Sequence, residues 1–259
     1  MTPHGQSAYR QRFDWGLAGA QALVADAEPG DVAVVVDVLS FTTTLSVAVE
    51  RGITVFPYPW GSDEAPAYAD ARGAVLALGR RAGLAEGGVS LSPVSFEDAD
   101  GIERVVLPSP NGSAISFALR DAGVTVVGAC LRNAGAVGAW LREAPGRVSG
   151  RVSVVAAGER WPDGSLRPAA EDLWGAGAVL SRLRLEEASP EARSAAAAYA
   201  DVRDDLGSAV ATCASGRELG EAGFVRDVEI AAAADVTDVV PVLRGEAYTR
   251  ASSWADTPG

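Results

Sequence analysis

A single carboxylate, Asp37, stands at the end of the apolar run 32–36 and directly before the hydroxyl-rich segment 40–44. The run has no polar alternation, so we expect a strand that is buried on both faces of a parallel sheet. Such sheets bind ligands just beyond the carboxyl ends of their strands, which makes Asp37 a candidate for acid, base or metal chemistry. An aspartate in this place also commonly caps a turn, and the segment alone favours neither interpretation.

Several mechanisms are excluded by side chains that the chain lacks. All 22 basic residues are arginines, and the single histidine is His4. A Schiff base or a P-loop lysine is therefore ruled out, as are a Ser-His-Asp triad and a His-ligated zinc site. Carboxylates, hydroxyls, amides and guanidinium groups remain. These groups suit an oxygen-liganded cation such as Mg²⁺, bound by Asp or Glu and by the oxygens of an anionic substrate.

The composition bounds the class of protein and its partners. The 259 residues are 48% hydrophobic, enough for a large core, and the net charge is −12 at pH 7 with no basic run. This charge argues against nucleic acid or an anionic membrane surface as a partner. The first 13 residues contain no apolar leader and the run 32–36 is too short to cross a bilayer, so we expect a cytoplasmic protein.

Neither cysteine receives a role, because Cys130 and Cys213 show no metal-binding spacing and no disulfide framework. We expect a small anionic molecule as the partner. A homodimer is compatible with the sequence, which does not decide the oligomeric state.

A repeated module organises the first half of the chain. Residues 37–55 align without a gap with residues 108–126, and Gly52 and Gly123 show the offset, 123 − 52 = 71 positions. Each copy is predicted to form a strand, a polar turn, a helix, a left-handed glycine and a second strand. Crossovers of this length predict parallel strands, although any βαβ unit shares the pattern.

Further βα units are predicted over 124–143 and 151–180, so we predict a three-layer α/β/α fold around a largely parallel sheet built from repeated βα units. Residues 62–72 carry a helix-start signature and precede a short strand at 75–79. Towards the C-terminal end we predict helices at 191–206 and 208–219 and extended segments at 224–230 and 239–243. The chain is expected to be one α/β domain, or two closely packed subdomains divided near 145–150, with a mobile tail at 249–259.

Four polar turns follow predicted strands, after Val38, Leu107, Ala129 and Ala157. Because the carboxyl ends of parallel strands share one edge of a sheet, we expect the polar side chains of these turns to lie close together. These side chains and the glycine among them are Asp37, Thr42, Thr43, Thr44, Ser109, Asn111, Gly112, Ser113, Asn133, Glu171 and Asp172. The last two open a predicted helix, where acidic residues also commonly do no more than complement the helix dipole.

From residue 34 to about residue 242 the chain resembles the 2-phosphosulfolactate phosphatases, which are Mg²⁺-dependent hydrolases of a phosphate monoester. Each matching motif is weak alone, but the order and spacing of the whole set make the resemblance specific. The set comprises Asp37-Val-Leu with Thr42-Thr-Thr, Gly79 with Arg81 and Gly83, Ser92-Pro93, Asn111-Gly-Ser, Asn133-Ala, Gly158 with Glu171-Asp172, and Gly216-Arg217 before Asp227-Val.

The resemblance implies a phosphatase in which helix N-termini and backbone amides hold phosphate oxygens beside a magnesium ion. It implies Asp37 with Glu171 or Asp172 as magnesium ligands, and Asn133 as an orienting amide in catalysis. Asp37 is alternatively the nucleophile of an aspartyl-phosphate intermediate. The residues implied in binding the phosphate ester are Thr42, Thr43, Thr44, Ser109, Asn111, Gly112, Ser113, Arg81 and Arg132.

Two arginines that the family pattern leads us to expect are absent, since Ser40 follows Asp-Val-Leu and Ala114 follows Asn-Gly-Ser. Conversely, Arg80 and Arg132 stand where the family has a glutamate and an uncharged residue. Contacts between guanidinium groups and oxyanions are geometrically strict, so we predict an altered substrate. Ordinary solvated surface arginines are the alternative interpretation of Arg80 and Arg132.

Two other functional classes are compatible with parts of the sequence. A protein on this scaffold that lacks the expected arginines could bind a phosphate ester without hydrolysing it. A Rossmann-type dinucleotide enzyme is disfavoured, because no Gly-x-Gly-x-x-Gly follows the first strong strand.

Overall fold

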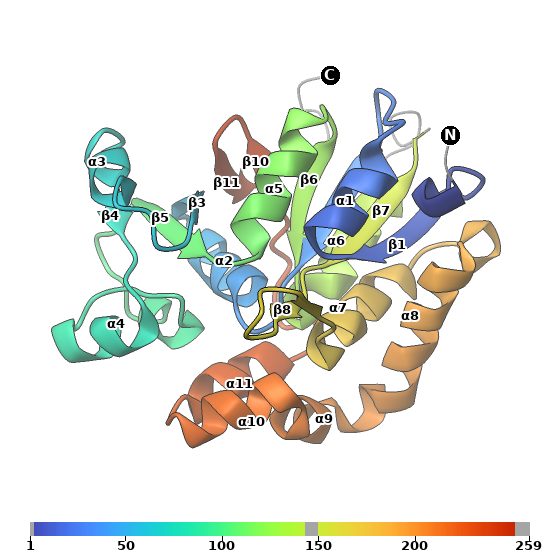
Figure 1. The fold of residues 1–259 in the computed structure, drawn as a ribbon. Coiled ribbons are helices and arrows are strands. Elements are labelled where there is room, and N and C mark those ends of the chain that lie inside the picture. Colours follow the sequence, from blue (N-terminus) through green and yellow to red (C-terminus); the bar gives the residue numbers. More distant parts are fainter. Residues whose placement is uncertain (1–2, 143–149, 252–259) are drawn as a thin grey trace.

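The computed structural model describes residues 3–142 and 150–251 (Figure 1). Within these ranges the chain forms a large sheet of nine strands with helices packed on both faces, which confirms the predicted three-layer α/β/α fold. The predicted boundary near 145–150 falls almost entirely outside the described residues, as do residues 252–259 of the predicted tail. No helix in the described part of the chain is both long enough and apolar enough to cross a membrane.

Two parallel blocks of strands make up this sheet, and an antiparallel hairpin joins them. The first block has the order β1 (Gln11–Trp15), β7 (Val152–Ala156), β2 (Val32–Val36) and β6 (Thr125–Ala129). The second block has the order β3 (Thr54–Pro59), β5 (Arg104–Ser109) and β4 (Val75–Leu76). Between β6 and β3 lies the hairpin of β10 (Pro241–Arg244) and β11 (Ala247–Arg250).

The hairpin changes the topology in a way that the repeat does not predict. Three antiparallel pairings separate β6 from β3, so the two blocks run in opposite senses. Consequently β2 and β3 are neither neighbours nor parallel, although the crossover between them predicts parallel strands. The hairpin also contains Thr249 and Arg250, where we expect the mobile tail to begin. A segment from the end of the sequence thus takes a central place in the sheet.

The repeated module is present as two strand–helix–strand units. The first unit runs from β2 through α2 (Phe41–Glu50) to β3, and the second from β5 through α5 (Gly112–Asp121) to β6. Gly52 and Gly123 follow the two helices with φ angles of +80° and +81°. This is the left-handed conformation predicted for both, which glycine adopts without strain.

Strand β2 is buried on both faces, as its unbroken apolar sequence predicts, and none of its residues is more than 2% exposed. Val32, Val34 and Val36 belong to a core cluster that includes residues of α6 (Ala134–Arg142), α7 (Ala170–Leu180) and α8 (Pro190–Val202). Ala33 and Val35 belong to the opposite cluster, with residues of α1 (Gly16–Val24), α2 and α5. Each buried valine stabilises the fold by about 1.5–3 kcal/mol, which holds the end of β2 firmly in place.

Smaller elements surround the sheet. The helix-start signature at 62–72 leads to α3 (Ala65–Asp70), and the short strand expected at 75–79 is β4. A two-stranded hairpin, β8 (Glu159–Arg160) with β9 (Leu166–Arg167), follows β7. Helix α4 (Arg80–Glu86) lies at the side of the second block in Figure 1.

Three short helices near the C-terminal end lie below the sheet in Figure 1: α9 (Leu206–Thr212), α10 (Ala214–Glu221) and α11 (Val225–Ala232). The helices α8 to α10 agree with the predicted helices at 191–206 and 208–219. The extended segment predicted at 224–230 is wrong, because α11 occupies these residues. Its buried residues Asp227, Val228 and Ile230, with Ala231, follow the spacing of one helix face rather than the alternation of a strand.

Candidate active site

Three of the four polar turns singled out in the sequence meet at one place, and Asp172 of α7 links two of them. Its Oδ1 accepts a hydrogen bond from the Val38 N–H, after β2, at 2.7 Å. Its Oδ2 accepts one from the Gly158 N–H, after β7, at 2.8 Å. The turn after β5 joins them because Nδ2 of Asn111 donates to the carbonyl oxygen of Gly158 at 2.9 Å.

Asp37 is held beside this junction by the N-terminal ends of two helices. Its Oδ1 accepts the Phe41 N–H of α2 at 3.0 Å, and its carboxylate also accepts the Gly112 N–H of α5. A larger residue at 112 would not fit, because a Cβ there would lie 2.3 Å from Cδ1 of Phe41. The Asp37 carboxylate therefore does cap α2, but it also interacts with other carboxyl groups nearby.

Four carboxyl groups act on one another at this place, and we call them the carboxylate cluster: Asp37, Glu159, Glu171 and Asp172. Only 8% of Asp37, 2% of Glu171 and 3% of Asp172 is exposed. Burial, with repulsion from the other members, raises the pKa of Asp37 to about 6 and that of Glu159 to about 7. The same causes raise the pKa of Asp172 well above its usual range.

Two guanidinium groups oppose this repulsion only in part. Arg80 lowers the pKa of Asp37, and Arg167 lowers the pKa of Glu159, yet both pKa values remain raised. Negative charge therefore outweighs positive charge at the site. Strongly perturbed carboxyl groups gathered at the ends of strands are typical of functional sites.

The donor set of the cluster fits Mg²⁺ in its chemistry. Among residues 3–142 and 150–251, no three His, Cys, Asp or Glu side chains are already gathered around one point that could hold a metal ion. Mg²⁺ does not need such a cage, because it usually takes one or two carboxylates and fills its shell with water and phosphate oxygens. Both oxygens of Asp172 accept backbone amides, whereas the carboxylate of Glu171 accepts only the Cys213 thiol among the described residues, so Glu171 is the better candidate to join Asp37.

Glu171 has one further neighbour, a cysteine to which the sequence assigns no role. Sγ of Cys213, at the start of α10, lies 3.2 Å from Oε2 of Glu171. Burial and the negative charge of Glu171 raise the pKa of Cys213 to about 12, so the thiol stays protonated and donates to the carboxylate. This contact ties the C-terminal helices to the carboxylate cluster.

The hydroxyl groups predicted to bind the phosphate are turned inward in this structure. Oγ1 of Thr42 accepts the N–H of Asp37 at 2.9 Å and donates to the Asp37 carbonyl oxygen at 2.8 Å. Oγ1 of Thr43 donates to the carbonyl oxygen of Val38 at 2.7 Å. Thr44, Ser109 and Ser113 are equally buried. These side chains shape the turns, and a direct contact with phosphate stays a prediction.

Two other candidates, Asn133 and Arg132, bond to groups outside the carboxylate cluster. Asn133 is fully buried, and its Nδ2 donates to the carbonyl oxygens of Gly128, at 3.3 Å, and Val239, at 3.0 Å. Arg132 forms an ion pair with Glu50 at 3.0 Å. The structure thus places both in the turn after β6 as structural links, and their predicted catalytic and substrate-binding roles remain untested.

The adjacent arginines Arg80 and Arg81 have different surroundings. Arg81 is exposed on α4. Arg80 is not the solvated surface residue of the alternative interpretation, because its Nη2 donates to Oγ of Ser40 and its Nε lies 3.4 Å from Oδ2 of Asp227. Its guanidinium group therefore reaches position 40, where the family pattern leads us to expect an arginine.

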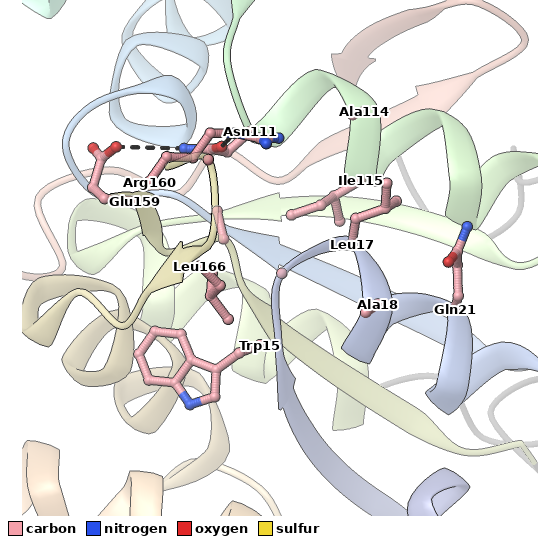
Figure 2. A pocket seen from close by; sticks show the side chains of 13 residues that line it. Trp15, Leu17, Ala18, Gln21, Asn111, Ala114, Ile115, Glu159, Arg160 and Leu166 are labelled. Atoms are coloured by element: carbon pink, nitrogen blue, oxygen red, sulfur yellow. Dashed lines mark hydrogen bonds between the residues drawn. The ribbon is translucent and has the colours of Figure 1, made fainter. Parts of the chain in front are cut away.

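A pocket of about 310 Å³ opens beside the cluster, between α1, α5 and the β8–β9 hairpin (Figure 2). Asn111, Glu159 and Arg160 are among its polar residues, and Nε of Arg160 donates to Oδ1 of Asn111 at 3.0 Å. Ala114 also lines it, so Arg160 brings a cation into the space around the second absent arginine. Glu159 and Arg160 are not among the residues singled out from the sequence, although two charges directly after a strand and a glycine are a usable signal.

The comparison with known proteins decides the family. A family model described as 2-phosphosulpholactate phosphatase matches residues 20–246. This chain belongs to the 2-phosphosulfolactate phosphatase family. The match contains the whole carboxylate cluster, and it confirms the resemblance drawn from the motifs.

Three curated relatives of the 2-phosphosulfolactate phosphatase family support the same assignment. The chain is 30% identical over 227 residues to a probable 2-phosphosulfolactate phosphatase of Deinococcus radiodurans, covering 85% of this chain and 91% of the relative. It is 30% identical to the 2-phosphosulfolactate phosphatase of Methanothermobacter thermautotrophicus, with 84% and 88% covered. It is 32% identical to a probable 2-phosphosulfolactate phosphatase of Thermus thermophilus, with 83% and 89% covered. The predicted enzyme class, a phosphoric monoester hydrolase, is the class that the family name states.

The raised pKa of Glu159 predicts how the free energy of unfolding of the metal-free protein depends on pH. Its ordinary pKa of 4.5 becomes about 7 on folding, so its stabilising contribution is complete below pH 4.5 and is lost as the pH rises through 7. The free energy of unfolding in EDTA should therefore fall between about pH 5 and about pH 8. Glu159→Gln should remove about 2 kcal/mol of this decrease.

Urea unfolding at the two pH values measures this effect. Glu186→Gln, an exposed glutamate before α8, is the matched control and should leave the decrease unchanged. An equal decrease in the wild-type protein and in Glu159→Gln would contradict the assigned pKa.

Proposed function

We propose that this protein hydrolyses a small anionic phosphate monoester in a Mg²⁺-dependent reaction at the carboxylate cluster. The proposal rests on four mutually repelling carboxyl groups, three of them buried, which come from the turn after β2, the start of β8 and the first turn of α7. An anionic ester approaches such a concentration of negative charge only if a cation offsets it. The family name supports hydrolysis of a phosphate ester. Magnesium is supported by the carboxylate oxygens of the cluster, which are the kind of ligand that Mg²⁺ prefers.

Asp37 and Glu171 would hold the ion. When bound, Mg²⁺ would supply positive charge for the phosphoryl oxygens as negative charge develops on them. Asp172 holds the Val38 and Gly158 amides together, which keeps the turns after β2 and β7 in register. The amides of Phe41 and Gly112 fix the direction of the Asp37 carboxylate.

Glu159 is the proposed proton donor. A pKa of about 7 leaves its carboxyl group partly protonated at neutral pH, which is close to the optimum for general acid catalysis. It also lines the pocket beside the cluster, where the alcohol part of an ester could lie. As the ester bond breaks, the Glu159 carboxyl hydrogen would transfer to the oxygen of the leaving alcohol.

Asp37 as the nucleophile of an acyl-phosphate remains the alternative mechanism. Its carboxylate already accepts two backbone N–H groups, which stabilise its negative charge and lower its nucleophilicity. We therefore propose that water attacks the phosphorus atom and that Asp37 acts as a ligand.

Substituting Asp37 tests the proposal most simply. Asp37→Asn keeps the size of the side chain but removes its charge, so the rate of Mg²⁺-dependent phosphate release should fall about 10³-fold or more. Glu171→Gln should cause a comparable loss. Asp201→Asn, at an exposed site on α8, should release phosphate at the wild-type rate.

Phosphate release from a panel of small esters, measured with and without EDTA, gives the result. If the wild-type protein binds an ester but releases no phosphate from any of them, the non-catalytic binding protein is the correct interpretation. Radioactive phosphate retained on Asp37 in a single turnover would instead show that Asp37 is the nucleophile.

Glu159→Gln separates proton donation from the rest of the site. An alkyl phosphate needs a proton on its leaving oxygen, so its hydrolysis should slow about 10²- to 10³-fold. Nitrophenyl phosphate has a stable leaving anion and should lose less than about 10-fold. Equal losses for both esters in parallel assays would rule out Glu159 as the acid.

The arginines around the cluster support an altered substrate. Positions 40 and 114 carry no cation in this chain, while Arg80 reaches Ser40 and Arg160 lies in the pocket lined by Ala114. Because these guanidinium groups come from other elements, their directions differ from those of side chains at 40 and 114. We infer that the alcohol part of the substrate is recognised differently from that of relatives with arginine at both positions.

A further inference from the structure

Arg80 is a half-buried cation beside the carboxylate cluster, held from two sides. Its side chain is 20% exposed, and its Nη2 donates to Oγ of Ser40, three residues after Asp37. Its Nε pairs with Oδ2 of Asp227 at 3.4 Å, and its guanidinium carbon lies 6.0 Å from the centre of the Phe224 ring. The start of α4, the turn after β2 and α11 therefore meet at this one side chain.

Asp227 is built to orient this arginine. It is 1% exposed, and its Oδ1 accepts a hydrogen bond from Oγ of Ser92 at 2.6 Å. Only Oδ2 is then left for Arg80. A buried carboxylate is costly unless it is paired. Because the guanidinium group is planar, a contact at its Nε fixes the direction of its two terminal nitrogens.

The remaining edge of Arg80 is free to bind a ligand. In the part of the chain that the structure describes, Nη1 of Arg80 has no hydrogen-bond partner. A pocket of about 430 Å³ is lined by Arg80 together with Ser90, Ser92 and Phe224. Arg80 thus stands between this pocket and the turn that carries Asp37.

We propose that Arg80 binds a second anionic group of the substrate, a carboxylate or a sulfonate on the alcohol part of the ester, and that Asp227 is its positioning residue. The proposal rests on the proposed function for the phosphoryl group. An oxyanion suits the free edge of Arg80, because a guanidinium group offers it paired N–H donors.

Three small phosphate esters test the proposal. Ethyl phosphate lacks the second charge of 2-phosphoglycolate, and the phosphate ester of 2-hydroxyethanesulfonate carries a sulfonate instead. Arg80→Gln should raise KM for an acid-bearing ester about 10- to 100-fold with little change in kcat, and should leave both constants for ethyl phosphate unchanged. The acid-bearing ester with the larger increase identifies the group as carboxylate or sulfonate.

Further variants separate binding from folding. Asp227→Asn, which keeps the shape beside Ser92, should raise the same KM by a smaller factor, and Arg80→Lys should restore part of the affinity. Arg193→Gln, on the exposed surface of α8, should behave as the wild-type protein. Far-ultraviolet circular dichroism establishes that each variant is folded.

Calorimetric binding of 2-phosphoglycolate and the sulfonate ester, each against ethyl phosphate, distinguishes failure of this inference from failure of the proposed function. If the wild-type protein hydrolyses none of the esters, the proposed function fails, while weaker binding of one acid-bearing ester to Arg80→Gln still supports the role of Arg80. Equal effects of Arg80→Gln on all three esters would place Arg80 at the phosphoryl group and overturn the inference. Unchanged affinity for both acid-bearing esters would also overturn it.

Discussion

Repulsion among buried carboxyl groups is the constraint on which the site depends. Asp37, Glu171 and Asp172 are almost fully buried, and their charges oppose one another and Glu159. The fold tolerates this because four backbone amides, from two turns and two helix starts, point at Asp37 and Asp172. Those bonds position the carboxylates but leave the pKa values raised, so a divalent cation would gain binding energy from relieving the repulsion.

Arginine is the only base that this chain uses around the site. Arg80 and Arg160 reach the spaces near Ser40 and Ala114 from α4 and from the β8–β9 hairpin. The cations that the family pattern places on α2 and α5 have thus been replaced by cations from more distant segments. Under the proposed function, such a change would keep positive charge near the phosphoryl group and would alter which other anionic groups can be bound.

The parts that were predictable from the sequence are those governed by local pattern. The unbroken apolar run of β2, the left-handed Gly52 and Gly123, and the polar turns after the parallel strands β2 and β7 follow from periodicity and from the rule on strand ends. The arrival of Asn111 beside them does not follow from that rule, because β5 runs in the opposite sense to β2. The β10–β11 hairpin was not predictable as the centre of the sheet, because strand order depends on long-range pairing. Arg80 looked like a surface residue for the same reason, since its partner Asp227 lies 147 positions away on a helix mistaken for an extended segment.

The effect of Mg²⁺ on stability shows whether the carboxylate cluster binds a cation. In urea unfolding at about pH 8, above the raised pKa values of Asp37 and Glu159, MgCl₂ should raise the free energy of unfolding above its value in NaCl of equal ionic strength, by about 2–3 kcal/mol near 100-fold excess over Kd. The increase should disappear in Asp37→Asn and in Glu171→Gln. An equal free energy of unfolding in both salts for the wild-type protein would contradict the account.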